Sequence, residues 1–260
     1  MIAKKKFKKK YRKKTKKITP STVNPNQKLL LPTHIHPFDS TLMILVNLPV
    51  NKNQPLNSTQ DNLTRLNKSP NTSSKIKLFY IDYTEVTLKQ YKKTHPKHDQ
   101  SHLPEKGDCL SCPAMEVDWK NADNHCRLVG KRLPTEEEWE SAARGSFKYS
   151  RLWNKKITKL QANLIGEEDG FISVAPVGSF PLGTGSYGAM DMIGNVWEWV
   201  STPHSPIPTN LKKQNHKSFR ISKGGSWASQ HHLATISYRN VVNSDIKNPT
   251  FGFRCAKSID

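Results

Sequence analysis

Beyond residue 145 the sequence contains only short apolar stretches, each soon followed by glycine, proline, asparagine or serine. These residues interrupt helices and strands and supply the backbone conformations that turns require. This half of the chain therefore predicts many turns and few strands. Three of its tryptophans, Trp197, Trp199 and Trp227, offer large apolar surfaces, and we expect them to fill the core of a domain that has little regular structure.

Two segments before this region have the apolar spacing of amphipathic helices. The first begins with Asp118 as its predicted N-cap and ends at Gly130. The second lies within residues 133–145, where Thr135 and Glu138 form the T-x-x-E pattern of a capping box. These two principal helices stand beside loop-rich β structure, so we predict an α+β fold in a single domain.

Apolar and β-branched residues predict strands within residues 40–50 and 76–86. The intervening residues 51–75 are rich in Asn, Ser and Thr and predict a loop. Residues 1–37 offer little to bury. We therefore assign residues 1–37 to a basic, disordered tail and residues 38–260 to the folded domain.

The net charge of +20 is concentrated at the start of the chain, because residues 1–17 hold eleven of the 41 Lys and Arg residues and no acid. A run of like charge repels itself and stays disordered. Such a tail would contact nucleic acid or an anionic membrane surface without sequence specificity; the alternative is a solvated tail with no dedicated partner. A nucleic-acid-binding function would rest on this tail alone.

No convincing secretory signal follows the basic start, because polar "ITPSTVNPNQ" stands where an apolar segment should be. The later run "TLMILVNLPV" is too short to span a bilayer. We expect a soluble or peripherally attached protein whose export the sequence leaves open.

Six blocks occur in the order and spacing of one known family: "FYIDYTEVTLKQY" (79–91), "GKRLPTEEEWESAARG" (130–145), "APVGSF" (175–180), "YGAMDMIGNVWEWV" (187–200), "KGGSW" (223–227) and "GFRC" (252–255). The chain thus resembles the formylglycine-generating enzymes, or sulfatase-modifying factor domains, over roughly residues 38–258. The resemblance implies a C-type-lectin-like fold. Activity is a separate matter, since one fold can carry many functions.

The founding activity of this family oxidises a sulfatase cysteine to formylglycine with oxygen and copper, which two cysteines after the GGS motif bind. Aligned without gaps, those positions fall on Ser229 and Ala234. Cu(I) prefers thiolates, so we expect neither copper nor the oxidase reaction. His231 and His232 could bind a metal, but neighbours on a strand point to opposite faces, and solvent-facing polar residues are the alternative.

The resemblance also places Trp197 and Ser226 at the floor of the catalytic groove, where they would line a pocket without its reactive metal. It further implies two calcium sites. Carboxylates, amides and backbone carbonyls are the oxygen ligands that calcium takes; without an ion, the same acids would cap turns and pair with arginines. The matching residues are Asn163, Leu164, Asp169 and Phe171 in the first site, and Asp191, Gly194, Val196 and Glu198 in the second.

Cys126 and Cys255 match positions that form a disulfide in exported relatives, whereas two buried free thiols in a cytosolic protein are the alternative. The resemblance favours an extracytoplasmic location, in the periplasm or at the cell surface. Arg239 and Arg254 are expected to pair with buried acids rather than with a ligand anion.

One insertion lies outside the family blocks: "HPKHDQSHLPEKGDCLSC", residues 95–112. It allows three interpretations. Cys109 and Cys112 could bind zinc with two of its three histidines, form a local disulfide, or remain free thiols. The histidines concerned are His95, His98 and His102.

These observations favour a non-oxidase domain that acts as a binding or structural module for an unidentified protein or small ligand, with calcium as its stabilising ion. The alternative is an enzyme on the same fold, either the formylglycine-generating oxidoreductase or one with an unknown reaction. An enzyme needs convergent acids, bases or metal ligands in its groove, whereas a binding module needs exposed aromatic and polar residues.

Overall fold

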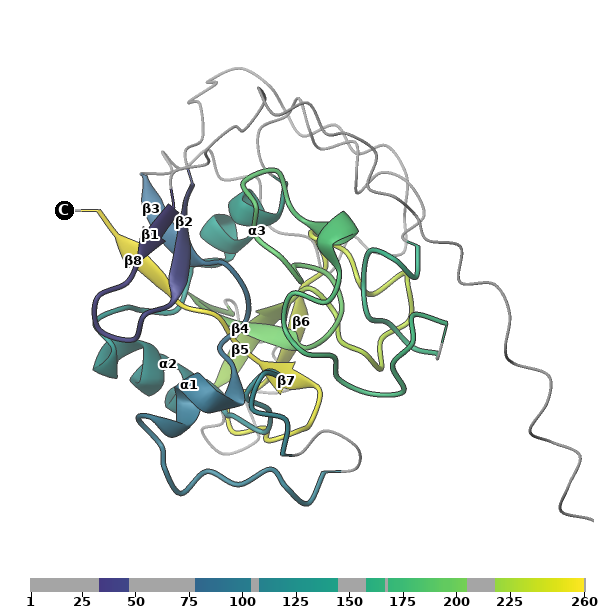
Figure 1. The fold of residues 1–260 in the computed structure, drawn as a ribbon, viewed down its shortest axis with the longest axis horizontal. Coiled ribbons are helices and arrows are strands. Elements are labelled where there is room, and N and C mark those ends of the chain that lie inside the picture. Colours follow the sequence, from purple (N-terminus) through teal and green to yellow (C-terminus); the bar gives the residue numbers. More distant parts are fainter. Residues whose placement is uncertain are drawn as a thin grey trace, which may run out of the picture. The chain divides into compact units, whose positions relative to one another are not determined.

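The computed structural model describes residues 33–46, 78–103, 108–144, 158–166, 168–204 and 218–259. Within these ranges the chain forms helices and two four-stranded sheets joined by long irregular segments (Figure 1). The α+β prediction is therefore confirmed. The basic segment 1–17 and the predicted loop 51–75 lie outside the described residues.

The first sheet has the strand order β1-β2-β3-β8 and is antiparallel throughout. Its strands are β1 (Thr33–Ile35), β2 (Leu42–Val46), β3 (Phe79–Asp82) and β8 (Ala256–Ser258). Strands β2 and β3 lie within the two ranges predicted as strands. Strand β1 precedes residue 38, where we placed the start of the domain, and it belongs to the sheet because it pairs with β2.

The second sheet has the strand order β6-β5-β4-β7. Its strands are β4 (Trp197–Pro203), β5 (Phe219–Lys223), β6 (Asn240–Asn243) and β7 (Phe251–Gly252). Only the β4–β7 pair is parallel among these strands. Trp197 and Trp199 of β4 pack with Phe251 and Phe253, whereas Val200 packs in a second cluster with Trp139. The first four residues of β4 are therefore buried on both faces of the strand.

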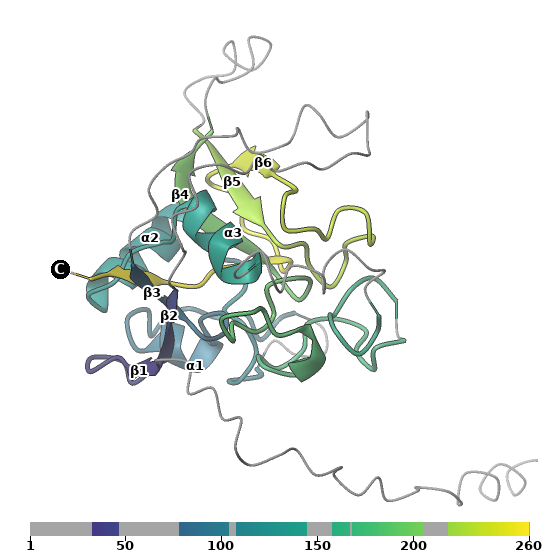
Figure 2. The same cartoon turned by 90° about the horizontal axis from the view of Figure 1, so that it is seen from above.

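In the described part of the chain three α-helices accompany the sheets: α1 (Leu88–Lys92), α2 (Trp119–Leu128) and α3 (Glu136–Arg144); a short 3-10 helix spans Pro181–Gly183. Helices α2 and α3 contact β4, and the view from above places both beside it (Figure 2). The predicted caps are present. The Asp118 carboxylate accepts a hydrogen bond from the Asn121 amide at 2.8 Å. The Thr135 hydroxyl accepts one from the Glu138 amide at 3.1 Å, and the Glu138 carboxylate accepts one from the Thr135 amide at 2.9 Å.

Two tryptophans have buried rings whose indole N–H groups donate hydrogen bonds. Trp139 donates to the Glu198 carboxylate at 2.8 Å, and Trp199 donates to the Val117 carbonyl at 2.8 Å. Both rings are fully buried, while Trp227 is only partly buried. A buried indole needs such an acceptor, so these hydrogen bonds tie α3 to β4 and β4 to the segment before α2.

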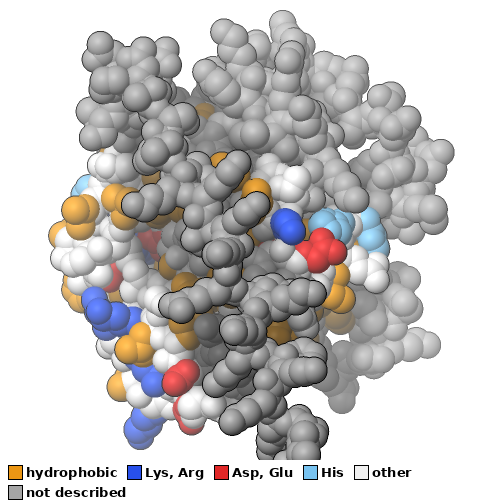
Figure 3. Space-filling view, turned by 45° about the vertical axis from the view of Figure 1, so that its right-hand side comes forward, with side chains coloured by type: hydrophobic (Ala, Val, Ile, Leu, Met, Phe, Trp, Pro, Cys, Tyr) orange, Lys and Arg blue, Asp and Glu red, His pale blue; other side chains and the backbone are white. Residues whose placement is uncertain are grey.

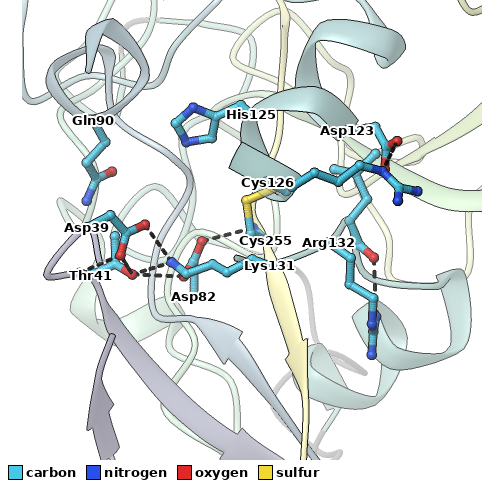
Figure 4. The surroundings of a disulfide bond; sticks show 12 residues. Asp39, Thr41, Asp82, Gln90, Asp123, His125, Cys126, Lys131, Arg132 and Cys255 are labelled. Carbon is cyan, nitrogen blue, oxygen red and sulfur yellow. Dashed lines mark hydrogen bonds and ion pairs between the residues drawn. A yellow bond between two sulfur atoms is a disulfide. The ribbon is translucent and has the colours of Figure 1, made fainter. Parts of the chain in front are cut away.

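The disulfide between Cys126 and Cys255 is present and joins α2 to the segment before β8 (Figure 4). Beside it, the ammonium of Lys131 donates at 2.8 Å to the carboxylates of both Asp39 and Asp82. The other Asp82 oxygen accepts from the Cys255 amide at 2.9 Å. This buried charge cluster ties the β1–β2 loop, β3 and the C-terminal segment together.

Candidate functional site

The GGSW motif forms a sharp turn that only glycine fits. Gly224 and Gly225 have φ angles of 93° and 87°, in a region that other residues rarely adopt. A Cβ atom added to Gly224 would lie 3.1 Å from the indole of Trp139 and 3.0 Å from the Met192 carbonyl. The turn is thus packed directly against the core.

The two positions that match the family's copper cysteines both lie close to Gly225 of this turn. A Cβ added to Gly225 would lie 2.8 Å from Cβ of Ala234 and 3.6 Å from Cβ of Ser229. The Ser229 hydroxyl accepts a hydrogen bond from the Ser226 amide at 2.9 Å, and its oxygen lies 3.1 Å from the Ser226 hydroxyl oxygen. The structure therefore brings these two positions together, but it presents a hydroxyl and a buried methyl group there.

Two neighbouring histidines follow the turn in the sequence. His231 and His232 lie in a turn, not on a strand as we assumed, and both are exposed. Consequently they do not point to opposite faces of a sheet. Among the described residues, no group of three or more His, Cys, Asp or Glu side chains is placed to hold a metal ion.

Trp197 and Ser226, the predicted groove residues, are buried. Trp197 is 7% exposed and Ser226 is 1% exposed. The Trp197 ring lies 5.9 Å from the ring of partly buried Tyr238. These side chains therefore present little surface to a ligand.

An open cavity of about 450 Å³ lies next to the turn. The amide of Ile165 donates to the Ser229 carbonyl at 3.2 Å, which holds the cavity's main loop against the turn. Its lining combines apolar and charged side chains, and Figure 3 shows basic, acidic and histidine side chains gathered on one face. The lining residues are Thr158, Lys159, Ala162, Leu164, Ile165, Gly166, Glu168, Asp169 and His231.

The four residues of the first predicted calcium site lie together beside this cavity. Both Asp169 oxygens accept backbone hydrogen bonds, from Leu164 at 3.1 Å and from Phe171 at 2.9 Å. The Asn163 amide nitrogen donates to Asn195 at 3.1 Å, while its buried oxygen has no hydrogen-bond partner. That oxygen is a hard donor atom without a ligand.

The second predicted site divides into two parts. The Asp191 carboxylate accepts from the Gly178 amide at 2.5 Å through one oxygen, and its other oxygen is buried without a partner. The Glu198 carboxylate, in contrast, is occupied by Arg254 at 2.6 Å and 2.7 Å and by the Trp139 indole. Arg254 therefore pairs with a buried acid, as predicted. So does Arg239, which lies 2.9 Å from Glu136.

The sequence analysis missed Glu85, which belongs to this region. One of its oxygens accepts from the Asn195 side-chain amide at 3.0 Å, and the other is buried without a partner. Burial and the nearby Asp191 charge raise the pKa of Glu85 well above its usual value. Burial likewise raises the pKa of Asp191. Burial of two neighbouring carboxyl groups disfavours the state in which both are ionised.

Two non-glycine residues in the same loop have left-handed backbone conformations. Asp191 has a φ of 57° and Asn195 has a φ of 58°, a region that Asp and Asn tolerate better than most residues. Asp191 is one of the two carboxyl groups, and the Asn195 side-chain amide donates to the other, Glu85.

Comparison with known proteins identifies this architecture. The family model described as sulfatase-modifying factor enzyme 1-like domain matches residues 50–259. The inactive C-alpha-formylglycine-generating enzyme 2 of Mus musculus is 35% identical over 167 residues, which cover 57% of this chain and 50% of that protein. The formylglycine-generating enzyme of Mus musculus is 32% identical over 187 residues, which cover 62% and 48%.

The fold itself is shared with the solved structure of PvdO from Pseudomonas aeruginosa. The match has a TM-score of 0.64 at 20% identity and covers 88% of this chain and 98% of that one. The chain spans about half the length of the curated relatives that it matches. On the match of the family model, the chain belongs to the family of sulfatase-modifying factor enzyme 1-like domains.

Proposed function

We propose that this domain is a non-oxidase member of its family and acts as a binding or structural module for a protein or a small ligand. One observation carries the proposal: the two copper positions are adjacent but hold Ser229 and Ala234. The Ser229 hydroxyl is engaged with Ser226, and a methyl group offers no lone pair. These residues do not fit Cu(I), which takes soft sulfur ligands.

The cavity beside the turn supports a binding role, because its lining combines buried Ala162 and Leu164 with exposed Lys159, Glu168 and His231. Concave sites with a few polar groups around an apolar floor are typical of small-ligand binding. An enzyme with a different reaction is the alternative that this family's diversity leaves open.

The oxidase reaction is tested by incubating the protein with a sulfatase-type cysteine peptide, with and without copper. We expect no aldehyde product by mass spectrometry. The matched control is the S229C/A234C double variant, which restores two adjacent thiols and should bind Cu(I) at one ion per chain. Aldehyde formation by the unaltered protein above a metal-free blank would overturn the proposal.

We also propose that calcium stabilises the domain. The buried oxygen of Asn163 in the first predicted site, and those of Asp191 and Glu85 at the second, support a bound cation, since each is a hard donor without a hydrogen-bond partner. Carboxyl groups with raised pKa values gain most when a divalent ion replaces the shared proton. The Glu198 carboxylate would contribute indirectly, by holding Arg254.

Thermal unfolding with calcium or a chelator tests this proposal. Calcium should raise the melting temperature of the unaltered protein, because a ligand that binds only the folded state stabilises it. Asp191→Asn and Glu85→Gln should each reduce that increase. Asp245→Asn, at an exposed aspartate outside the region, should leave it unchanged. A melting curve insensitive to calcium in the unaltered protein would contradict the proposal.

An extracytoplasmic location is supported by the two disulfides, because disulfides persist mainly in oxidising compartments. None of the described helices is long and apolar enough to cross a membrane. We further propose that residues 1–17 contact polyanions or an anionic membrane surface without specificity, on the strength of their charge alone.

A further inference from the structure

The two disulfides of this chain differ in accessibility. Cys126 and Cys255 are both fully buried within one core cluster. In the other disulfide, Cys112 is fully buried, whereas Cys109 is only partly buried and its neighbours Leu110 and Ser111 are exposed. Cys109 is therefore the more accessible of the two cysteines to a thiol in solution, and Cys112 is shielded.

The loop that carries this disulfide is also held by its backbone. The Leu88 amide donates to the Cys112 carbonyl at 2.9 Å, and the Lys89 amide donates to the Leu110 carbonyl at 3.0 Å. On the other side, the Val177 amide donates to the Ser111 carbonyl at 3.0 Å. These bonds do not depend on the sulfur–sulfur bond, so the two cysteines should stay near each other after reduction.

Cys112 is anchored by packing as well. Its side chain lies in an apolar cluster with Met115, Val174 and Val196. Cys109 packs at the edge of that cluster, and its sulfur lies 3.5 Å from the Ser111 hydroxyl oxygen. The arrangement has one approachable sulfur and one protected sulfur, separated by two residues. Cys-x-x-Cys pairs of this type exchange readily when one sulfur is accessible.

We propose that Cys109 and Cys112 form a thiol–disulfide exchange site that accepts electrons from a protein or peptide carrying two thiols. A thiolate of the partner attacks the Cys109 sulfur, the bond to Cys112 breaks, and Cys112 leaves with the electron pair and takes up a proton. The partner is then joined to Cys109 through a mixed disulfide.

The partner's second thiolate completes the exchange. It attacks the partner's own sulfur in the mixed disulfide and releases Cys109 as a thiolate, which is protonated. The partner leaves oxidised to a disulfide, and Cys109 and Cys112 hold the two electrons and two protons it has lost. The neighbouring residue Leu110, which is 52% exposed, offers an apolar contact next to the attacked cysteine.

Selective reduction tests the accessibility on which the proposal rests. The folded protein is treated with low concentrations of dithiothreitol, and new thiols are alkylated and located by mass spectrometry. We expect Cys109 and Cys112 to be labelled at least about tenfold faster than Cys126 and Cys255, because exchange rates depend on access to the attacked sulfur. Equal labelling of both pairs, or labelling only when circular dichroism shows unfolding, would overturn the proposal.

Trapping tests the order of attack. In a Cys112→Ser variant the free Cys109 thiol should form a mixed disulfide with glutathione disulfide, whereas in a Cys109→Ser variant the buried Cys112 should remain unmodified. The two single variants therefore separate attack at Cys109 from attack at Cys112. Modification of Cys112 in preference to Cys109 would contradict the proposed attack.

Peptide oxidation tests the function directly. A peptide with two cysteines is incubated anaerobically with stoichiometric protein, and its disulfide is measured by mass spectrometry. The unaltered protein should oxidise one equivalent of peptide, and the C109S/C112S variant should oxidise none while keeping Cys126–Cys255 intact. Equal peptide oxidation by both proteins, or none by either, would overturn the proposal.

Discussion

The guanidinium of Arg254 holds the carboxylate of Glu198 through two hydrogen bonds of 2.6 Å and 2.7 Å, and both side chains are almost completely removed from solvent. Arg254 also donates to the Met190 carbonyl at 2.8 Å. The pair joins strand β4 to the segment before β8 and to the loop that carries Asp191. Its importance lies in what remains when one partner is lost, because a buried unpaired charge is costly.

Glu198→Gln should lower the free energy of unfolding by about 3–5 kcal/mol, since it leaves the buried Arg254 without its counter-charge. Urea denaturation measures the effect. Asp123→Asn is the matched control. It removes an ion pair with Arg127, whose side chain is 70% exposed, and should cost less than about 1 kcal/mol. Similar losses in the two variants would contradict this prediction.

His125 should make stability depend on pH. Its ring accepts or donates a hydrogen bond with Thr94 at 2.6 Å and packs against Phe253. Burial, then the charges of His95 and Lys131, lower the pKa of His125 to about 4, although Asp39 opposes the shift. A lowered pKa in the folded state means that stability is complete above the unfolded pKa of about 6.5 and is lost as the pH falls toward 4.

The loss attributable to His125 is on the order of 3 kcal/mol across that range. The pKa of Glu85 is raised, so protonation of Glu85 stabilises the fold as the pH falls and opposes the effect of His125. The effect of His125 is therefore measured as the difference between the unaltered protein and a His125 variant. Urea denaturation at several pH values should show a weaker loss between pH 6.5 and 4 in His125→Gln than in the unaltered protein. Parallel profiles would show that His125 is not the responsible group.

Gly225→Ala should be more harmful than an alanine at a comparable glycine elsewhere. Gly130 has a φ of 73° and no atom within 4 Å of an added Cβ, so Gly130→Ala carries only the backbone cost of about 1–2 kcal/mol. At Gly225 the added Cβ also meets Ala234 at 2.8 Å. We expect a further loss of about 1–3 kcal/mol from overpacking. Chemical denaturation of both variants measures the difference, and equal losses would refute the steric argument.

The two disulfides should contribute unequally to stability. They close loops with sequence separations of 129 for Cys126–Cys255 and 3 for Cys109–Cys112. Chain-entropy arguments give about 5 kcal/mol for the larger loop and about 2 kcal/mol for the smaller. Double Cys→Ala variants at each pair, compared by urea denaturation, should follow this order. A larger loss at the small loop would show that packing around Cys112 outweighs loop closure.

Deletion of residues 1–17 should leave the melting temperature unchanged and weaken binding to heparin, because this segment holds eleven Lys or Arg residues and no acid. Heparin retention should also become less sensitive to salt. A variant of full length, in which residues 1–17 are replaced by a neutral Gly/Ser segment, controls for chain length. A marked drop in melting temperature would mean that these residues contribute to the fold.

Local features were predictable from the sequence, and partners distant along the chain were not. The caps at Asp118 and Thr135 depend on residues three positions away, so the pattern alone reveals them. Helix α1 carries the same signature, since Thr87 and Gln90 form a capping box. We nevertheless predicted no helix after the strand within residues 76–86. Family resemblance supplied the Cys126–Cys255 pairing, which the structure confirms.

The site was harder to predict. We placed Glu198 among the calcium residues, but its carboxylate is taken by Arg254, which lies 56 positions further along the chain. Glu85 lies 110 positions before its hydrogen-bond partner Asn195, and nothing in the local pattern of residues 79–91 indicates that its side chain is buried. Burial and pairing over such separations are properties of the tertiary fold.

The pairing of β3 with β8 has a consequence for synthesis on the ribosome. Strand β3 ends at Asp82, whereas its partner comprises Ala256–Ser258, so nearly the whole domain must be translated before this edge of the first sheet can be covered. Until then the nascent chain exposes an unpaired strand, which is prone to pair with the wrong neighbour. Chaperone contact with emerging chains should therefore persist late into translation and end only when β8 has left the exit tunnel.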